Sequence, residues 1–398
     1  MTPTISGAAR RLLRGLAALL LATAGAAGAT SPAGAAARAA EPVPGTLVSS
    51  QPLPLDLWLP GTGAAYRITY VSTPADPAAP APVVVSGAVF VPQGTPPAGG
   101  WPVIGWAHAT VGVADPCAPS VAGRPQRDVD FLGAWLRAGY AVAATDYEGL
   151  GTPSPHPYLR GASEAYGVVD AVRAARAADP KGSLSRTWLA VGHSQGGQAA
   201  LFTGALQASY APELDYRGSV ALAPPSQWRT LIAAAEPFDF DPAKPASPFV
   251  FLLLEMMRAA HPGAIDPAAL LTPAGARLFP EVQKSLCVGD LIQRLSGHVN
   301  GDFFAIDAAE RETFTDLLIK DAEIPITRQA RPLYIAQGTA DTLVFPPAAQ
   351  TTAGLLAQAG SAVTFRFYGG ADHLGIEAAA LPDLLSWAAD RLHDRPAG

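Results

Sequence analysis

Short apolar runs alternate with amphipathic stretches along most of the chain. The apolar runs are rich in Val, Ile, Ala and aromatic residues, and Gly, Pro or polar residues bound them, which predicts β-strands. These runs are Ala64–Ser72, Val83–Val91, Pro102–Ala107, Ala141–Thr145, Trp188–Gly192, Gly218–Leu222, Pro332–Ala336 and Val363–Tyr368. The later runs lack the strict alternation of a sheet with one solvated face. This is typical of parallel strands that are buried on both faces.

Amphipathic stretches with helical periodicity lie between these runs. The predicted helices are Asp128–Ala138, Ala162–Ala178, Gln195–Ser209, Ala348–Ala359 and Pro382–Leu392. Strands that alternate with helices predict an α/β fold, in which flanking helices cover a mostly parallel central sheet.

The alternation stops once, between Pro224 and Ile326, where no strand pattern appears and several helices are joined by Pro-rich loops. Within this stretch, Pro248–Met257 is apolar on every face, which is typical of a buried helix or of the lining of an apolar pocket. We interpret residues 225–327 as a helical cap that interrupts a core formed by residues 40–224 and 328–398.

The amino terminus has the layout of a secretory signal peptide. Arginines precede an apolar run from Leu16 to Ala24, and a tract of small residues follows. Cleavage after Ala29 or after Ala39 fits the pattern. We favour Ala39, so residues 1–39 are the predicted signal peptide and the mature protein is expected to be secreted. The Arg10-Arg11 pair leaves general and twin-arginine export both open.

Hydropathy argues against a membrane anchor. The apolar run near the amino terminus is shorter than the roughly 20 residues that span a bilayer, and no other segment is long and apolar enough to cross a membrane. We therefore predict no stable membrane span.

Composition argues against a disordered protein and against a nucleic-acid-binding protein. The chain is 49% hydrophobic and 15% charged, with a formal net charge of −6. Such a chain buries a substantial core, which excludes a largely disordered protein. Its acidic balance and the absence of a Lys/Arg stripe argue against a nucleic-acid partner.

Cys117 and Cys287 are the only two cysteines. In an oxidising compartment they either pair or remain as two buried free thiols. A disulfide between them would stabilise the fold by roughly 4–5 kcal/mol, because it closes a long loop in the unfolded chain. Neither cysteine has the spacing of a metal ligand, so no metal site is predicted.

The most informative motif is Gly192-His193-Ser194-Gln195-Gly196, a G-x-S-x-G sequence between a predicted strand and an Ala-rich helix. A sharp strand-to-helix turn would expose the serine and place free backbone N–H groups beside it. The strand and the helix are the context that this motif requires. We therefore predict Ser194 as a nucleophile, rather than as a serine that merely caps a helix.

A nucleophilic serine needs a base and an orienting acid, and α/β hydrolases carry them in the order Ser, Asp or Glu, His. Of the histidines after Ser194, two lie in the predicted cap and one ends the last helix. His373 instead follows the last predicted strand. Asp341 follows the preceding strand and is the predicted acid. Asp372 is a rival, although a side chain adjacent in sequence to the histidine usually points elsewhere.

The oxyanion hole is expected to combine two backbone N–H groups. One is that of Gln195, directly after the nucleophile. The second belongs to the loop after the strand that ends at Ala107, where Ala109 and Thr110 are both candidates and the sequence does not choose between them. His108 is expected to be packed or to support the site rather than to act in catalysis.

Four sequence patterns resemble the secretory lipases of the LIP type, which are α/β hydrolases with an inserted helical cap. They are WAHATVGVADPCAPS (Trp106–Ser120), DYEGLG (Asp146–Gly151), the GHSQGG elbow and YGGADH before the last helix. The likeness extends from about Leu55 to the last helix. It implies an α/β-hydrolase fold and a secreted carboxylester hydrolase that acts on acylglycerols or simpler esters.

The resemblance also implies that Cys117 bonds to a cysteine in the cap, which here is Cys287. One departure concerns the oxyanion loop, where relatives often read H-G-T-T-G and this chain has HATVG at residues 108–112. The DYEGLG loop and His156 either line the pocket or are structural, and we do not assign them to the catalytic set.

The sequence thus predicts that Ser194 attacks an ester while His373 takes its proton, and that water then releases the acyl group. This chemistry requires no metal or organic cofactor. The expected partner is a lipid or small ester, and the apolar cap could contact a lipid interface. An acyltransferase or a peptidase could use the same three residues. A hydrolase fold that only binds ligands usually lacks one of them.

Overall fold

The computed structural model describes residues 43–74, 82–233 and 242–392, and the predicted signal peptide lies outside them. Within these ranges nine strands form one sheet in the order β1-β2-β3-β5-β4-β6-β7-β8-β9. The strands are β1 (Leu47–Pro52), β2 (Thr62–Ser72), β3 (Val83–Pro92), β4 (Trp101–Ala107), β5 (Ala141–Thr145), β6 (Leu184–His193), β7 (Asp215–Leu222), β8 (Leu333–Gly338) and β9 (Val363–Tyr368). Strands β1 to β3 pair antiparallel, and β3 pairs antiparallel with β5. The remaining neighbours in the sheet, from β5 through β4, β6, β7 and β8 to β9, all pair parallel.

All the strands expected from the apolar runs are present, and β1 is the addition. It escapes the hydrophobic pattern because five of its six residues are exposed, as is usual for an edge strand with one neighbour. Strand β6 begins at Leu184, earlier than its apolar run, because its polar first half still pairs with β4 and β7.

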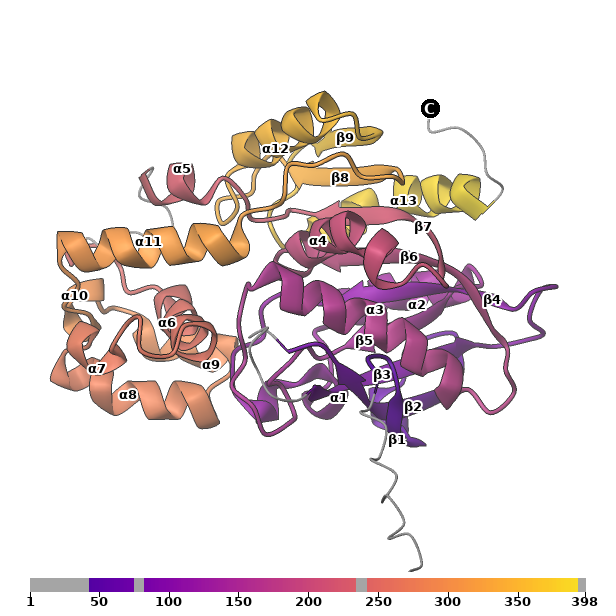
Figure 1. Cartoon of the computed structure of the whole chain (residues 1–398), viewed down its shortest axis with the longest axis horizontal. Helices are drawn as coiled ribbons and strands as arrows, with labels where there is room; N and C mark the ends of the chain where they lie inside the picture. The colour runs from indigo at the N-terminus through magenta and orange to yellow at the C-terminus, as the bar shows by residue number, and fades with distance from the viewer. Residues whose placement is uncertain (1–42, 75–81, 234–241, 393–398) are drawn as a thin grey trace, which may run out of the picture. The chain divides into compact units, whose positions relative to one another are not determined.

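Helices cover both faces of the sheet (Figure 1). One layer holds α3 (Gly161–Ala178), α4 (Gln195–Tyr210) and α12 (Pro346–Gln358), and the other holds α2 (Gln126–Arg137) and α13 (Ile376–Leu392). Shorter helical turns are Leu55–Leu57, Asp115–Cys117 and α1 (Pro119–Ala122). The fold is therefore an α/β-hydrolase fold, as expected.

Helix α13 begins at Ile376, six residues before its predicted start, and Pro382 lies inside it. A proline inside a helix costs about 3 kcal/mol, because it removes one hydrogen bond and clashes with the preceding turn. The additional turns bury Ile376 and Ala380 completely against the sheet. Full burial of an isoleucine side chain contributes about 1.5–3 kcal/mol, which offsets most or all of the cost of the proline.

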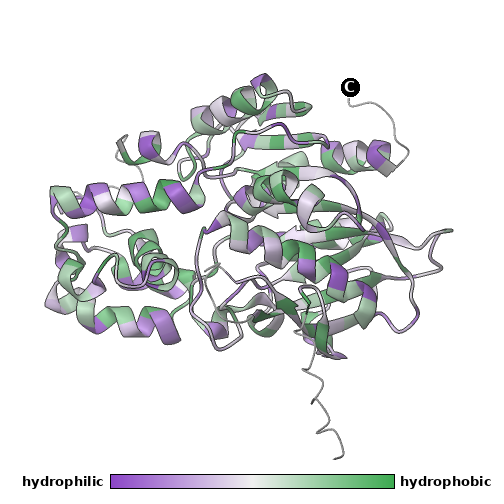
Figure 2. Cartoon of the chain, in the orientation of Figure 1, coloured by the Kyte–Doolittle hydropathy of each residue, from purple (hydrophilic) through white to green (hydrophobic). Residues whose placement is uncertain are grey.

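A group of helices interrupts the core between β7 and β8, and we call residues 228–233 and 242–322 the cap. Its helices are α5 (Trp228–Ala233), α6 (Pro248–Ala260), α7 (Pro267–Leu270), α8 (Pro273–Lys284), α9 (Val288–Leu295), α10 (Asn300–Phe303) and α11 (Ala308–Ala322). The apolar stretch expected as a buried helix or pocket lining is α6. Its residues from Val250 to Met257 are all buried, and Phe251 packs against three other phenylalanine rings of the cap. Figure 2 shows this apolar interior between more polar outer faces.

A disulfide joins the cap to the core. Cys117 and Cys287 are bonded, with their Cα atoms 5.4 Å apart, so the pairing implied by the resemblance is present and the alternative of two free thiols is wrong. Next to it, the backbone N–H of Val288 donates to the carbonyl oxygen of Val111 at 2.8 Å. The start of α9 is thereby held against the loop that follows β4.

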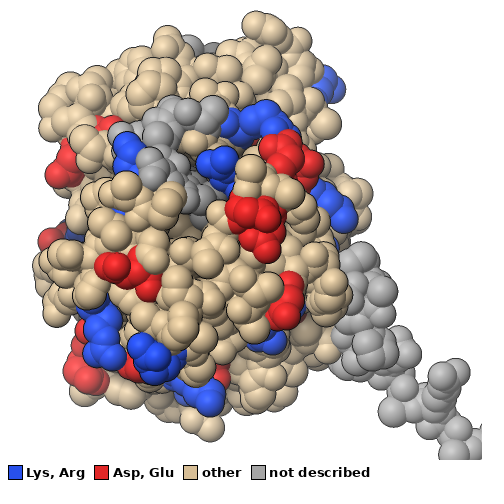
Figure 3. Space-filling model, turned by 90° about the vertical axis from the view of Figure 1, so that its left-hand side faces the viewer, with Lys and Arg blue, Asp and Glu red and all other residues tan. Residues whose placement is uncertain are grey.

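Charged groups on the cap are mixed in sign. Figure 3 shows acidic and basic side chains interspersed on the face that the cap helices present.

Among the described residues, no helix combines the length and apolar character needed to cross a bilayer. The same part of the chain contains no group of three or more His, Cys, Asp or Glu side chains arranged to hold a metal ion.

Candidate active site

Ser194 lies in a strained turn between β6 and α4. Its backbone has φ 54° and ψ −119°, a region that residues other than glycine rarely adopt and that costs about 1–3 kcal/mol. The turn is held by the Ser194 N–H, which donates to the carbonyl oxygen of Leu222 at 2.8 Å. A Cβ on Gly192 would overlap the backbone of Gly196, and one on Gly196 would overlap the carbonyl of Ala107. The motif needs both glycines for this reason.

Two loops at the carboxyl edge of the sheet bring Asp341 and His373 together. Asp341 follows β8, His373 follows β9, and His373 Nδ1 lies 2.8 Å from Asp341 Oδ2. The other carboxylate oxygen of Asp341 accepts the N–H groups of Leu343 and Val344 at 2.9 and 2.8 Å. The rival Asp372 is exposed and instead accepts the N–H of Gly375 at 2.7 Å.

These contacts set the charge of each partner. Burial raises the pKa of Asp341, but the hydrogen bonds from His373 and from two backbone N–H groups outweigh it and hold that pKa below its ordinary value. Burial also lowers the pKa of His373, against the opposing effect of Asp341. At neutral pH the pair is therefore a neutral imidazole beside a carboxylate. Because Nδ1–H is donated to Asp341, Nε2 carries the free lone pair.

His193 connects this pair to the serine turn. It is fully buried directly before Ser194, and its ring centre lies 4.9 Å from that of His373. Its Nε2 is 2.8 Å from the carbonyl oxygen of His373, and its Nδ1 is 3.0 Å from Glu377 Oε1 in the first turn of α13. Sequence reasoning assigned no role to His193, because the motif accepts many residues at that position.

Two of the candidate oxyanion residues, Gln195 and Thr110, line a small cavity beside Ser194. Its volume is about 20 Å³. Ser194, Gln195 and Thr110 line it, together with apolar side chains of the core and of α5 and α6; the apolar side chains include Leu159, Trp228, Leu231, Phe249, Leu343 and Val344. Ala109 is buried directly before Thr110. The cap therefore supplies one wall of this cavity.

His108 precedes the candidate oxyanion residues and is packed in the interior. It is 1% exposed, and burial lowers its pKa. Its Nδ1 lies 2.6 Å from the carbonyl oxygen of Ala109. These contacts hold the loop after β4 and leave His108 facing protein groups.

The chain is similar in sequence to a described lipase relative and in fold to two solved structures. The chain is 24% identical over 384 residues to a Mycobacterium tuberculosis protein described as a probable inactive lipase, and this covers 89% of this chain and 80% of that protein. It superimposes on Candida antarctica lipase A in its closed state with a TM-score of 0.71 and 20% identity, over 90% of this chain and 84% of the other. The rice cell wall degrading esterase of Xanthomonas oryzae gives a TM-score of 0.69 and 20% identity, over 89% and 100%.

A match to a family model assigns the chain to a protein family and not only to a fold. The secretory lipase model matches residues 121–398, which include the serine turn, the cap and both loops that carry Asp341 and His373. Together with the sequence patterns and the architecture, this match identifies the chain as a member of the secretory lipase family.

Proposed function

We propose that the protein is a secreted serine carboxylester hydrolase in which Ser194, His373 and Asp341 form the catalytic triad. The observation that supports the proposal most directly is the buried His373–Asp341 pair at 2.8 Å. The hydrogen bond from His193, the residue before Ser194, to the backbone of His373 supports it as well. Family membership supports an ester hydrolase. The description of one relative as inactive belongs to that relative; this chain has all three side chains.

In the proposed mechanism, Ser194 Oγ attacks the ester carbonyl carbon and passes its proton to His373 Nε2. The tetrahedral oxyanion collapses, the C–O bond to the alcohol breaks, and His373 returns the proton to the departing oxygen. Water then attacks the acyl-serine by the same steps and releases the carboxylic acid. Asp341 stays ionised and stabilises the imidazolium form of His373.

Two backbone N–H groups would bind the oxyanion. Gln195 is the first residue of α4, so its N–H is among those that have no partner within the helix. Thr110 lines the same cavity as Ser194, which favours its N–H over that of Ala109 as the second donor. The apolar walls of this cavity suit an acyl chain and contain no cluster of charged groups.

The test compares the mature chain, residues 40–398, with Ser194→Ala and with Ser219→Ala. Ser219 is a buried serine in β7 and serves as a matched control. Initial rates on p-nitrophenyl esters from acetyl to palmitoyl are combined with labelling by a fluorophosphonate and mass mapping of the labelled peptide. We expect turnover and labelling at Ser194 in the wild type and in Ser219→Ala, and neither in Ser194→Ala. A wild type that is neither active nor labelled would overturn the proposal.

A further inference from the structure

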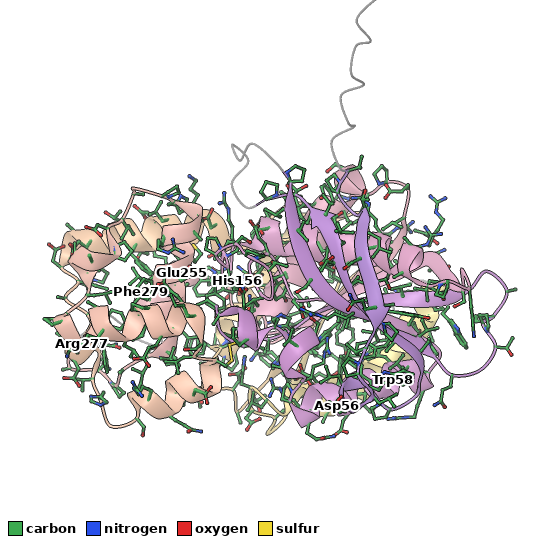
Figure 4. All side chains as sticks on the ribbon, turned by 90° about the horizontal axis from the view of Figure 1, so that it is seen from below. Asp56, Trp58, His156, Glu255, Arg277 and Phe279 are labelled. Carbon is green, nitrogen blue, oxygen red and sulfur yellow. A yellow bond between two sulfur atoms is a disulfide. The ribbon has the colours of Figure 1, made fainter. Side chains whose placement is uncertain are left out.

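The segment between β5 and α3 contacts both sides of the proposed oxyanion hole, although the proposed mechanism gives it no role. His156 lies in this segment where the cap meets the core (Figure 4), and it is fully buried. Burial lowers the pKa of His156 to about 3, so the ring is neutral. Its Nδ1 lies 2.7 Å from the carbonyl oxygen of Glu148, to which it donates. Its Nε2 is therefore an acceptor.

The side chain of Gln195 is held at two points. Its Nε2 donates to Glu164 Oε1 at 2.7 Å and lies 3.2 Å from Nε2 of His156. A carboxamide nitrogen has two N–H groups, and both have a partner here. Glu164 Oε1 also accepts the backbone N–H of Leu159 at 2.9 Å, so the first turn of α4 is bound to the start of α3.

Glu164 is suited to this role because burial favours its neutral form. It is 1% exposed, and burial raises its pKa to about 8, against the opposing hydrogen bonds from Gln195 and Leu159. A neutral carboxyl can accept hydrogen bonds inside the protein without the cost of burying a charge beside the nucleophile.

The same segment contacts the second candidate donor. The hydroxyl of Tyr158 lies 2.8 Å from Thr110 Oγ1. Tyr147, in the DYEGLG sequence, donates its hydroxyl to the carbonyl oxygen of His108 at 2.9 Å. The rings of His108, Tyr147, His156 and Tyr158 follow one another with centre distances of 4.4, 6.0 and 6.1 Å. One short stretch of chain thus contacts both candidate donor residues, Gln195 through His156 and Thr110 through Tyr158.

We propose that His156, Glu164 and Tyr158 are positioning residues of the oxyanion hole: the first two act through the side chain of Gln195, and Tyr158 acts through Thr110. This inference rests on the proposed function. An oxyanion donor is effective only when it lies within about 2.7–3.1 Å of the developing charge. If the side chain of Gln195 loses its partners, the backbone N–H of Gln195 is less restrained. The expected result is weaker stabilisation of the transition state, which lowers kcat.

The main test compares Glu164→Ala with Glu164→Gln and with Asp170→Ala. Asp170 is a buried carboxyl on the same helix, and its contacts are with Ser72, Arg173 and Tyr210. The readouts are kcat and KM on p-nitrophenyl acetate, the Kd of an alkyl boronic acid that forms a tetrahedral adduct with Ser194, and Tm. We expect Glu164→Ala to lower kcat and boronate affinity by about 10–100-fold with little change in KM.

The controls separate positioning from stability. Glu164→Gln keeps an amide oxygen that accepts both hydrogen bonds, so it should stay within about threefold of the wild type. Asp170→Ala should lower Tm without the loss in kcat and boronate affinity. Equal kinetic losses in the two alanine variants, or none in Glu164→Ala, would overturn the inference.

Tyr158→Phe provides a test that does not depend on Glu164, because it removes one hydroxyl from the second side of the hole and keeps the ring. We expect it to lower kcat and boronate affinity together. Unchanged values for both would contradict the role of Tyr158. If the wild type itself is inactive and unlabelled, the proposed function fails; if the wild type is active and these variants match it, only this inference fails.

Discussion

His193 Nε2 lies 2.8 Å from the backbone carbonyl oxygen of His373, so the residue before the candidate nucleophile holds the candidate base by its main chain. The opposite nitrogen of His193 is 3.0 Å from Glu377. Burial raises the pKa of Glu377 to about 7 and lowers that of His193 to about 4. A neutral His193 donates from Nε2 to the carbonyl oxygen of His373, while its Nδ1 faces the buried carboxyl of Glu377.

His193→Phe tests this relationship. The change leaves the carbonyl of His373 without its donor in the interior, so we expect kcat to fall about tenfold and Tm to decrease. Steady-state kinetics with thermal melting measures both. Glu377→Gln keeps the size of the side chain and a polar group beside Nδ1, and its kcat should stay within about threefold of the wild type. An unchanged kcat in His193→Phe would show that the loop of His373 is held by other contacts.

Two aspartates in neighbouring loops, Asp341 and Asp372, are candidates for the acid that orients His373. Replacing each by asparagine tests which of them has this role. Asp341→Asn removes the charge that orients His373, and we expect kcat to fall by about 10⁴, the size of loss seen when a triad aspartate becomes an asparagine. Asp372→Asn affects an exposed cap of Gly375 and should leave kcat within about twofold. The reverse order of effects would make Asp372 the acid.

The pH dependence of kcat/KM should have its acid limb below pH 6.5. The mechanism needs neutral His373, and burial lowers the pKa of His373 from 6.5. Activity is therefore lost as the pH falls through that lowered pKa, and it is fully developed by neutral pH. Rates on p-nitrophenyl acetate between pH 4 and 8, read at an isosbestic wavelength, give the midpoint. A midpoint above 6.5 would contradict this prediction, because it would mean that Asp341 raises the pKa of His373 by more than burial lowers it.

The disulfide should matter for stability and for the oxyanion loop. Replacing Cys117 and Cys287 together by alanine is expected to lower the free energy of unfolding by about 4–5 kcal/mol. Because Val288 binds Val111 beside this bond, kcat should fall as well. Urea unfolding and kinetics are measured with and without a reducing agent, which should affect the wild type and leave the double variant unchanged. A wild type indifferent to reduction would contradict both effects.

The sequence predicted what local patterns encode. The G-x-S-x-G turn is contiguous, and the strands that carry Asp341 and His373 are apolar runs with polar loops after them, so both could be found without a structure. Contacts between distant segments could not. His193 meets a carbonyl that is 180 residues away, and Glu164 reads as an ordinary residue of an amphipathic helix although it accepts a hydrogen bond from Gln195.

The cap also contains a feature that the sequence predicts only in part. The apolar stretch in α6 suggests a buried helix or a pocket lining, and both are correct for different residues. Phe251 is fully buried in the cap interior, whereas Phe249, two positions earlier, faces the cavity at Ser194. When every position of a helix is apolar, periodicity contains no information about which side faces a ligand.

Phe249 should therefore limit the length of the acyl chain. Phe249 forms one wall of the cavity beside Ser194, so it restricts the space that an acyl chain can occupy there. Phe249→Ala removes one apolar wall and should shift the optimum in kcat/KM toward longer p-nitrophenyl esters by about tenfold relative to acetate. Phe279→Ala is the matched control, because Phe279 packs inside the cap against Phe251 and should lower Tm without a change in preference. An unchanged preference in Phe249→Ala would contradict this role of Phe249.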